Sequence, residues 1–244
     1  YHTKYDVDIA KAVRGKLLQE SAIRALVQNI ASCDEVWVVS RGAGENLRSL
    51  GYEGDYIVME NGVDVPRGRV SDEAIAAATG RYDLPQNVPV FLFVGRLMWY
   101  KGIRIILDAL KTLREKNVDF RMVFVGEGAD GAEIRSYAEE RKLSDRCFFT
   151  GAISDREIIR AWYGRSDLFL FPSTFDTNGL VVREAAASGT ATVMIRNSCA
   201  SEGVGDGRNG FCIEENAAAM AAKLEELCRA PEVMQVVGEN AQRE

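Results

Sequence analysis

The sequence predicts an α/β protein built on a doubly wound parallel sheet, and three observations support this prediction. From residue 90 onward, short apolar runs alternate with segments of helical periodicity. The runs VFLFV, MVFV and LFLF are continuously apolar, as strands buried on both faces are. Strands that alternate with helices need crossover connections, and right-handed crossovers place helices on both faces of a parallel sheet.

The segment before residue 64 predicts the last part of another unit. Thr3 and Asp6 have the spacing of a capping box, and a helical pattern extends from Asp8 to Ile30. Three further elements are expected: strands Val36 to Val39 and Tyr56 to Met59, and between them a helix from Gly42 to Leu50. Prolines and glycines between Val63 and Asn87, around one short Ala-rich helix, indicate a connection between two domains, with the boundary near Asp64.

The expected elements of the second unit are strand Val90 to Val94, helix Gly102 to Lys116, strand Phe120 to Val125, helix Ala132 to Lys142, strand Cys147 to Phe149, helix Asp155 to Tyr163, strand Leu168 to Phe171, helix Gly179 to Ser188, strand Ala191 to Ile195 and a helical pair after Asn216. The first helix has one apolar stripe, formed by Ile103, Ile106, Leu107, Leu110 and Leu113. Ser154 and Glu157 have the spacing of a second capping box.

Composition argues against several classes of protein. The 244 residues are 47% hydrophobic, which is typical of soluble globular domains, and the formal net charge of -6 argues against a nucleic-acid partner. The five cysteines are widely spaced without a CxxC pair, so we expect buried thiols in a reducing compartment and no metal site.

No apolar run reaches the ~20 residues of a membrane span and no leader is visible, so we expect a cytoplasmic protein that could still touch the inner face of a membrane. Because the first residue is Tyr1 rather than Met and a helix start follows almost at once, we expect a fragment of a longer protein.

Ligands of such sheets bind outside the carboxyl ends of the strands, and two loops there carry glycine or charge. In FVGRLMWYKG, Arg96 and Lys101 follow a strand and precede a helix, which suits a diphosphate. The alternative is that both are solvated surface charges. The motif VGEG, from Val125 to Gly128, allows a planar ligand to approach the backbone, or serves only the geometry of the turn.

A third loop, within FDTNGLVVREAAASG, leads into a helix near Gly179. The amides of Gly179, Leu180 and Val181 are then unpaired donors at the positive end of a helix and suit a phosphate. Glu184 can accept hydrogen bonds from the vicinal hydroxyls of a ribose, and Asp176 can do the same for a second sugar. The alternative is that Asp176 only caps the helix and that Glu184 only favours its positive end.

Together these motifs, with FFTG, SDLFLFPS and EGVGDGRNGF, resemble the retaining nucleotide-sugar glycosyltransferases of family four (group 1), which have the GT-B fold. NGVD, from Asn61 to Asp64, is similar to the family's interdomain junction. The resemblance implies that residues 1–63 are the C-terminal part of an incomplete acceptor domain. Residues 64–244 would be the Rossmann-like domain that binds the nucleotide sugar.

The resemblance implies two groups of site residues. Asp176, near the transferred sugar, and His2, the cleft-facing histidine, are the catalytic candidates. The substrate-binding candidates are Arg96 and Lys101 on the diphosphate, Ile153 beside the nucleobase, Glu184 on the ribose, and Asn178, Gly179, Leu180 and Val181 at the start of the helix. The sequence departs from the family at Asp176, where Glu is usual, at Thr177 and Asn178, where Gly-Phe is frequent, and at Glu60, where Pro is usual.

The implied reaction is transfer of a hexosyl group from a nucleotide-diphosphate sugar to an acceptor, with retention and without a metal or another cofactor. Asp6 and Asp8 form a DxD, but acidic residues are ordinary at a helix start. The nucleobase, the hexose and the oligomeric state stay open, and the acceptor could be a glycan, a lipid or a small molecule, with peripheral membrane contact through the acceptor domain. The alternatives are a nucleotide-binding module without turnover, and an epimerase or a phosphorylase of the same fold.

Overall fold

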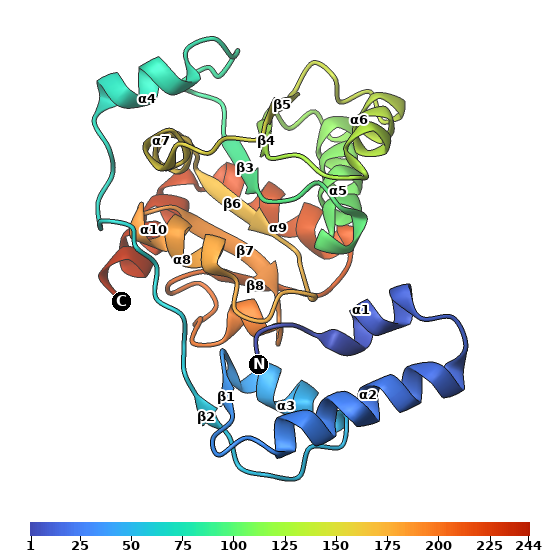
Figure 1. Ribbon diagram of the computed structural model, residues 1–244. Coiled ribbons are helices and arrows are strands. Elements are labelled where there is room, and N and C mark those ends of the chain that lie inside the picture. The colour runs from blue at the N-terminus through green and yellow to red at the C-terminus, as the bar shows by residue number, and fades with distance from the viewer.

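A six-stranded parallel sheet forms the centre of the larger part of the molecule, which a computed structural model describes over residues 1–244, apart from the side chains of Val7 and Lys11 (Figure 1). Its strands are β3 (Val90–Val94), β4 (Arg121–Val125), β5 (Cys147–Gly151), β6 (Leu168–Phe171), β7 (Ala191–Ile195) and β8 (Phe211–Ile213). They lie in the order β5-β4-β3-β6-β7-β8. The chain thus adds β4 and β5 on one side of β3, and then β6, β7 and β8 on its other side. Such a switch point, here between β3 and β6, opens a crevice at the carboxyl ends of these strands.

Helices cover both faces of this sheet (Figure 1). One face carries α5 (Ile103–Glu115), α6 (Gly131–Glu140) and α9 (Ala217–Arg229), and the other carries α7 (Arg156–Arg165) and α8 (Leu180–Ala187). The last helix, α10 (Pro231–Arg243), packs against β7 and α8. The predicted stripe of α5 is fully buried against the first face. The doubly wound α/β architecture is thus confirmed, with every residue of β3, β6 and β7 buried.

The first 58 residues form a smaller part of the molecule, at the bottom of Figure 1. It contains the helices α1 (Tyr5–Ala12), α2 (Lys16–Ala31) and α3 (Arg41–Ser49), and a two-stranded parallel sheet of β1 (Trp37–Val38) and β2 (Ile57–Val58). Residues 59–89 run from there along the larger part, and their helix α4 (Asp72–Thr79) packs on α7. From β1 onward, the expected order of strand, helix, strand and one short helix is confirmed.

Several local predictions were wrong. The expected helix from Asp8 to Ile30 is two helices, because α1 ends at Ala12 and α2 begins after Gly15. The proposed capping box of Thr3 and Asp6 does not form, since α1 has Lys4 at its N-cap without a side-chain bond.

Two further corrections concern the larger part. The N-cap of α7 is Asp155 rather than Ser154, and its carboxylate accepts the amides of Glu157 and Ile158. Strand β8 was not predicted, because a three-residue run is too short to stand out beside the glycines of EGVGDGRNGF. The expectation of buried thiols holds for Cys147, Cys199 and Cys212, whereas Cys228 is only partly buried and Cys33 is exposed.

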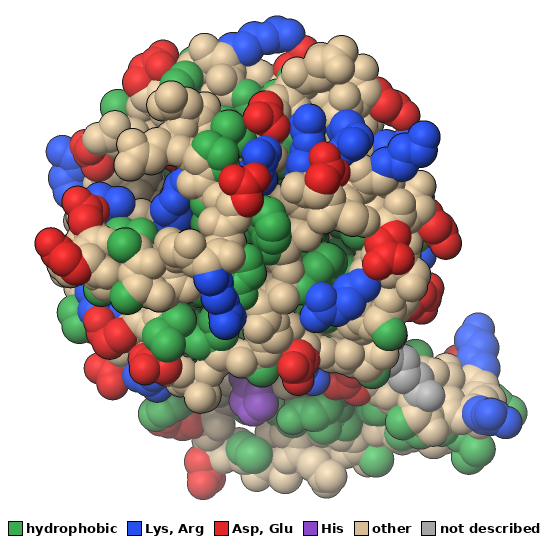
Figure 2. Space-filling view, turned by 90° about the horizontal axis from the view of Figure 1, so that it is seen from above, with side chains coloured by type: hydrophobic (Ala, Val, Ile, Leu, Met, Phe, Trp, Pro, Cys, Tyr) green, Lys and Arg blue, Asp and Glu red, His purple; other side chains and the backbone are tan. Residues whose placement is uncertain are grey.

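The surface carries mixed charge. On the face shown in Figure 2, Lys and Arg side chains are interspersed with Asp and Glu, and the smaller part projects from beneath the larger one. Within the described residues, no helix has both the length and the apolar character that crossing a bilayer requires.

Candidate functional site

A cavity of about 310 Å³ opens at the carboxyl ends of β3 and β6, between the larger and smaller parts of the molecule. Seven of the ten site residues singled out from the sequence line it: His2, Lys101, Asp176, Asn178, Gly179, Leu180 and Val181. Arg96, Ile153 and Glu184 are not in the lining. The strand order explains this grouping, because β3 and β6 are neighbours whose following loops emerge side by side.

Lys101 and Asp176 meet in this cavity, with Nζ of Lys101 2.5 Å from Oδ1 of Asp176. Their loops can approach because Gly102 has no side chain, since a Cβ there would lie 2.2 Å from the carbonyl oxygen of Pro172. Only 12% of the Lys101 side chain and 22% of the Asp176 side chain are exposed. Lys101 is therefore not a solvated surface charge.

Asp176 keeps one acceptor available. Its Oδ2 is buried and has no hydrogen-bond partner among the described residues. The N-cap of α8 is Gly179, and no side chain in the described part of the chain caps this helix, so the alternative that Asp176 is a helix cap is wrong. A buried carboxylate oxygen without a donor is costly, and a ligand hydroxyl in the cavity could supply that donor.

The start of α8 forms another wall of the cavity. Gly179, Leu180 and Val181 bring the first amides of the helix to the cavity, and such amides have no carbonyl partner within the helix. They carry the positive end of the helix dipole, and the Lys101 ammonium adds a full charge nearby. The arrangement suits an anion with several oxygens.

Glu184 lies in the second turn of α8, where Oε2 is 3.4 Å from the hydroxyl of Tyr163. Burial raises the pKa of Glu184, and the Tyr163 hydroxyl and the charge of Arg156 partly oppose this shift. Sequence reasoning missed Tyr163, which the neighbouring LFLF strand and the start of α8 bury. No local sequence pattern distinguishes such a tyrosine from an ordinary core residue.

The smaller part of the molecule holds the loop that carries Asp176. The hydroxyl of Thr177 donates to the carbonyl of His2 at 2.6 Å, and the Asn178 amide donates to the carbonyl of Val39 at 2.7 Å. The hydroxyl of Ser40, in turn, donates to the carbonyl of Thr177 at 2.5 Å. These contacts place the His2 backbone against this loop, while its ring nitrogen Nδ1 lies 3.0 Å from the Thr3 hydroxyl.

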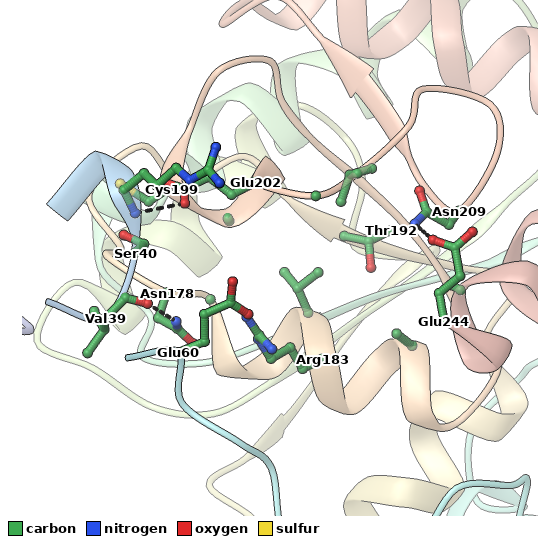
Figure 3. Close-up of a pocket in the computed structure, with 18 residues that line it drawn as sticks. Val39, Ser40, Glu60, Asn178, Arg183, Thr192, Cys199, Glu202, Asn209 and Glu244 are labelled. Carbon is green, nitrogen blue, oxygen red and sulfur yellow. Dashed lines mark hydrogen bonds and ion pairs between the residues drawn. The ribbon is translucent and has the colours of Figure 1, made fainter. Parts of the chain in front are cut away.

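A second cavity of about 540 Å³ also borders α8, and Asn178 and Gly179 line both cavities (Figure 3). There Arg183 donates to Glu60 at 2.7 Å, so Glu60 pairs with the helix that carries Glu184. Glu202 accepts the backbone amides of Arg41 and Gly42 at 2.9 and 2.6 Å. The first contact fastens the connecting segment to α8, and the second fastens the smaller part to the larger one.

The remaining candidates lie outside the first cavity. Arg96 is exposed, with its guanidinium 6.0 Å from the centre of the Tyr100 ring, and its phosphate contact stays a prediction. Ile153 is half-buried against the apolar cluster that contains Tyr163, and its nucleobase contact also stays a prediction. In VGEG, a Cβ on Gly126 would lie 2.0 Å from the carbonyl oxygen of Gly95, so backbone packing accounts for this glycine.

Comparison with curated proteins finds glycosyltransferases. The chain is 29% identical over 255 residues to a D-inositol 3-phosphate glycosyltransferase of Streptomyces avermitilis, in a match that covers 99% of this chain and 54% of that protein. It is 23% identical over 201 residues to an alpha-monoglucosyldiacylglycerol synthase of Streptococcus pneumoniae, covering 81% of this chain and 45% of that protein. The chain therefore spans about half the length of these relatives.

Solved structures share the fold of this chain. Anabaena HepE in complex with UDP and glucose has a TM-score of 0.80 and 22% identity, and the match covers 92% of this chain and 62% of that chain. Sucrose-phosphate synthase from Thermosynechococcus elongatus has a TM-score of 0.79 and 24% identity, with coverage of 96% and 59%. These likenesses confirm the GT-B type of fold. The family model of glycosyl transferases group 1 matches residues 77–244, more than half of the chain, and the chain therefore belongs to this family.

Proposed function

We propose that this chain binds a nucleotide-diphosphate sugar and supports transfer of its hexosyl group to an acceptor with retention of configuration. The observation that carries the proposal is the meeting of Lys101, Asp176 and the first amides of α8 in one cavity at the switch point. These groups come from two loops, and each suits a different portion of such a donor. The chain spans about half of its curated relatives, so activity is proposed for the protein as a whole.

The diphosphate would lie against the start of α8. Cleavage of the bond between the sugar and the β-phosphate leaves additional negative charge on the leaving diphosphate. The amides of Leu180 and Val181 and the ammonium of Lys101 are fixed before the reaction and can stabilise that charge. Arg96 would add a second cation if it turned from Tyr100 toward the cavity. This chemistry needs no metal, and EDTA should leave activity unchanged.

The two sugars of the donor would be recognised by carboxylates. Asp176 has one oxygen on Lys101 and another that is buried without a partner, which could accept a hydroxyl of the hexose. Glu184 would accept the vicinal hydroxyls of the ribose. Ile153 would lie beside the nucleobase. For retention, the acceptor hydroxyl would attack from the face that the diphosphate leaves, with the diphosphate accepting its proton and no covalent enzyme intermediate.

Binding can be tested by calorimetry with UDP, GDP and ADP, each up to millimolar concentration. We expect one of the three to bind wild-type protein, and Lys101→Met to weaken that binding. Lys116→Met is the matched control, because Lys116 pairs with Glu225 on the surface of the larger part. No binding of any of the three nucleotides would overturn the proposal.

Turnover is a separate question. Transfer of radiolabelled hexose from the matching donor to glycan, lipid and small-molecule acceptors tests it, and the anomeric configuration of the product tests retention. Binding without transfer to any acceptor would favour a nucleotide-binding module. One relative is named as a synthase of a glucosyldiacylglycerol, so lipid acceptors and vesicle co-sedimentation belong in the test of a cytoplasmic, peripherally bound enzyme.

A further inference from the structure

Tyr163 stands in the last turns of α7 with 1% of its surface exposed. Its ring packs edge to face on Phe169 of β6, at 5.5 Å between centroids. The carbonyl of Tyr163 accepts the hydroxyl of Thr190 at 2.8 Å, which fixes the backbone as well. A tyrosine so deeply buried has to find partners for its hydroxyl, and the identity of these partners points to its role.

The hydroxyl of Tyr163 faces two acceptors, both on α8. It lies 3.1 Å from the carbonyl oxygen of Val181 and 3.4 Å from Oε2 of Glu184. Val181 belongs to the first turn, whose amides line the cavity, and Glu184 belongs to the second. One buried hydroxyl thus connects the proposed phosphate and ribose contacts.

Glu184 has few other restraints. Among the described residues, Tyr163 is the one hydrogen-bond partner of its carboxylate, which is half-buried and has three rotatable bonds. A glutamate that is free to rotate loses more conformational entropy when a ligand fixes it. The hydroxyl engages only Oε2, so Oε1 keeps its lone pairs for a ligand.

We propose that Tyr163 is a positioning residue, which holds the carboxylate of Glu184 in the orientation that receives the vicinal hydroxyls of a ribose. The inference rests on the proposed function, because it assigns Glu184 to the ribose of a nucleoside diphosphate. A purely structural Tyr163 would instead stabilise the packing of α7 on α8 without affecting the choice between ribose and deoxyribose.

The test compares ribonucleotide with deoxyribonucleotide. Calorimetry with the best-binding diphosphate among UDP, GDP and ADP, and with its 2′-deoxy analogue, gives a ribose preference. We expect roughly tenfold preference in the wild type, the size of one hydrogen bond to a charged group. Tyr163→Phe keeps the ring and should lower this preference to about threefold or less, with binding of the deoxy analogue unchanged.

Two further variants make the result specific. Tyr137→Phe is the control, because the Tyr137 hydroxyl also donates to a carboxylate, that of Asp108, outside the cavity. It should keep the wild-type preference. Glu184→Gln should lose the preference, and adding Tyr163→Phe to it should have no further effect on the preference.

Each contrary result has a distinct meaning. Wild-type preference in Tyr163→Phe, or an equal loss of both affinities, would overturn the positioning role while leaving the proposed function intact. If Tyr163→Phe fails to fold, Glu184→Gln decides, since a wild-type preference in that variant overturns the inference as well. Absence of nucleotide binding by wild-type protein would overturn the proposed function itself.

Discussion

Glu202 of the larger part accepts the backbone amide of Gly42 at 2.6 Å and so supplies a carboxylate to the N-terminus of α3 in the smaller part. The same carboxylate accepts the amide of Arg41, and Ser40 caps the helix with its own hydroxyl. Two of the unpaired amides of α3 are thus satisfied by a residue about 160 positions away. The loop between β7 and β8 therefore holds the smaller part of the molecule against the larger part through the Glu202 carboxylate.

Glu202→Gln should weaken the contact between residue 202 and the N-terminus of α3. The variant keeps an oxygen acceptor but loses the charge that favours a helix N-terminus, an effect of about 0.3–1 kcal/mol. We expect faster amide hydrogen exchange in α3 and a Tm lower by about 2–4 °C or less. Glu226→Gln is the control, because Glu226 pairs with Lys223 within α9. Equal exchange in α3 for both variants would show that the Glu202 charge does not hold the parts together.

Lys101→Met should lower nucleotide affinity by about tenfold to a hundredfold. The substitution removes the ammonium, leaves the Asp176 carboxylate without its partner, and returns negative charge to the proposed diphosphate site. Calorimetry at two salt concentrations checks this, since a charge contribution in a site open to solvent falls as salt rises. An affinity within twofold of the wild type would remove Lys101 from the site.

Glu184 should make nucleotide binding sensitive to pH. Its pKa is raised above its ordinary value of 4.5, mainly by burial, against the opposing effects of the Tyr163 hydroxyl and Arg156. Binding of a ribose needs the ionised carboxylate, so affinity should fall with decreasing pH at values already above 4.5. Glu184→Gln provides the baseline, because the phosphates of the nucleotide titrate equally in both proteins. Identical pH profiles would exclude a carboxylate contact with the ribose.

The raised pKa of Glu184 also predicts how the stability of the fold depends on pH. A raised pKa means that the folded protein takes up a proton on Glu184 more readily than the unfolded chain does. The contribution of this group is therefore most favourable below pH 4.5 and is lost as pH rises through the higher folded value. At pH 7, Glu184→Gln should melt at the same or a higher temperature than the wild type. A lower Tm would mean that the ionised carboxylate stabilises the fold.

The sequence predicts the sheet well because its signals are local. Strand β6 is apolar throughout and ends at Pro172, so both its bounds follow from the chain itself. The gathering of Lys101 and Asp176 is implied by the resemblance of their loops to the family, and the strand order that places β3 beside β6 comes from the structure. The support given by Tyr163, and the contact of Thr177 with His2, could not be predicted, because they depend on how separate elements pack.

Thr177→Val should separate recognition of the sugar from that of the nucleotide. The variant keeps the shape of the side chain but removes the hydroxyl that donates to the carbonyl of His2, so the loop that carries Asp176 loses one of its attachments to the smaller part. We expect nucleoside diphosphate affinity to stay unchanged and affinity for the matching nucleotide sugar to fall several-fold, measured by calorimetry. Thr112→Val is the control, because among the described residues the Thr112 hydroxyl bonds to the carbonyl of Asp108, within α5. Parallel loss of both affinities would mean that the whole cavity, rather than the loop, has been disturbed.

Asp176→Glu tests whether the shorter carboxylate selects the hexose. In this protein Oδ1 is held by Lys101 and Oδ2 is buried, so a side chain longer by about one methylene has to move Oε2 further into the cavity or give up the ion pair. Either outcome changes the space and the acceptor offered to the hexose. We therefore expect the order of kcat/KM among UDP-glucose, UDP-galactose and GDP-mannose to change, while affinity for the nucleoside diphosphate stays within about threefold. Asp176→Asn keeps the size but loses the charge, and it should lower transfer from every donor without changing their order. If both variants match the wild type in rate and order, Asp176 does not contact the hexose, and its carboxylate serves only to neutralise Lys101.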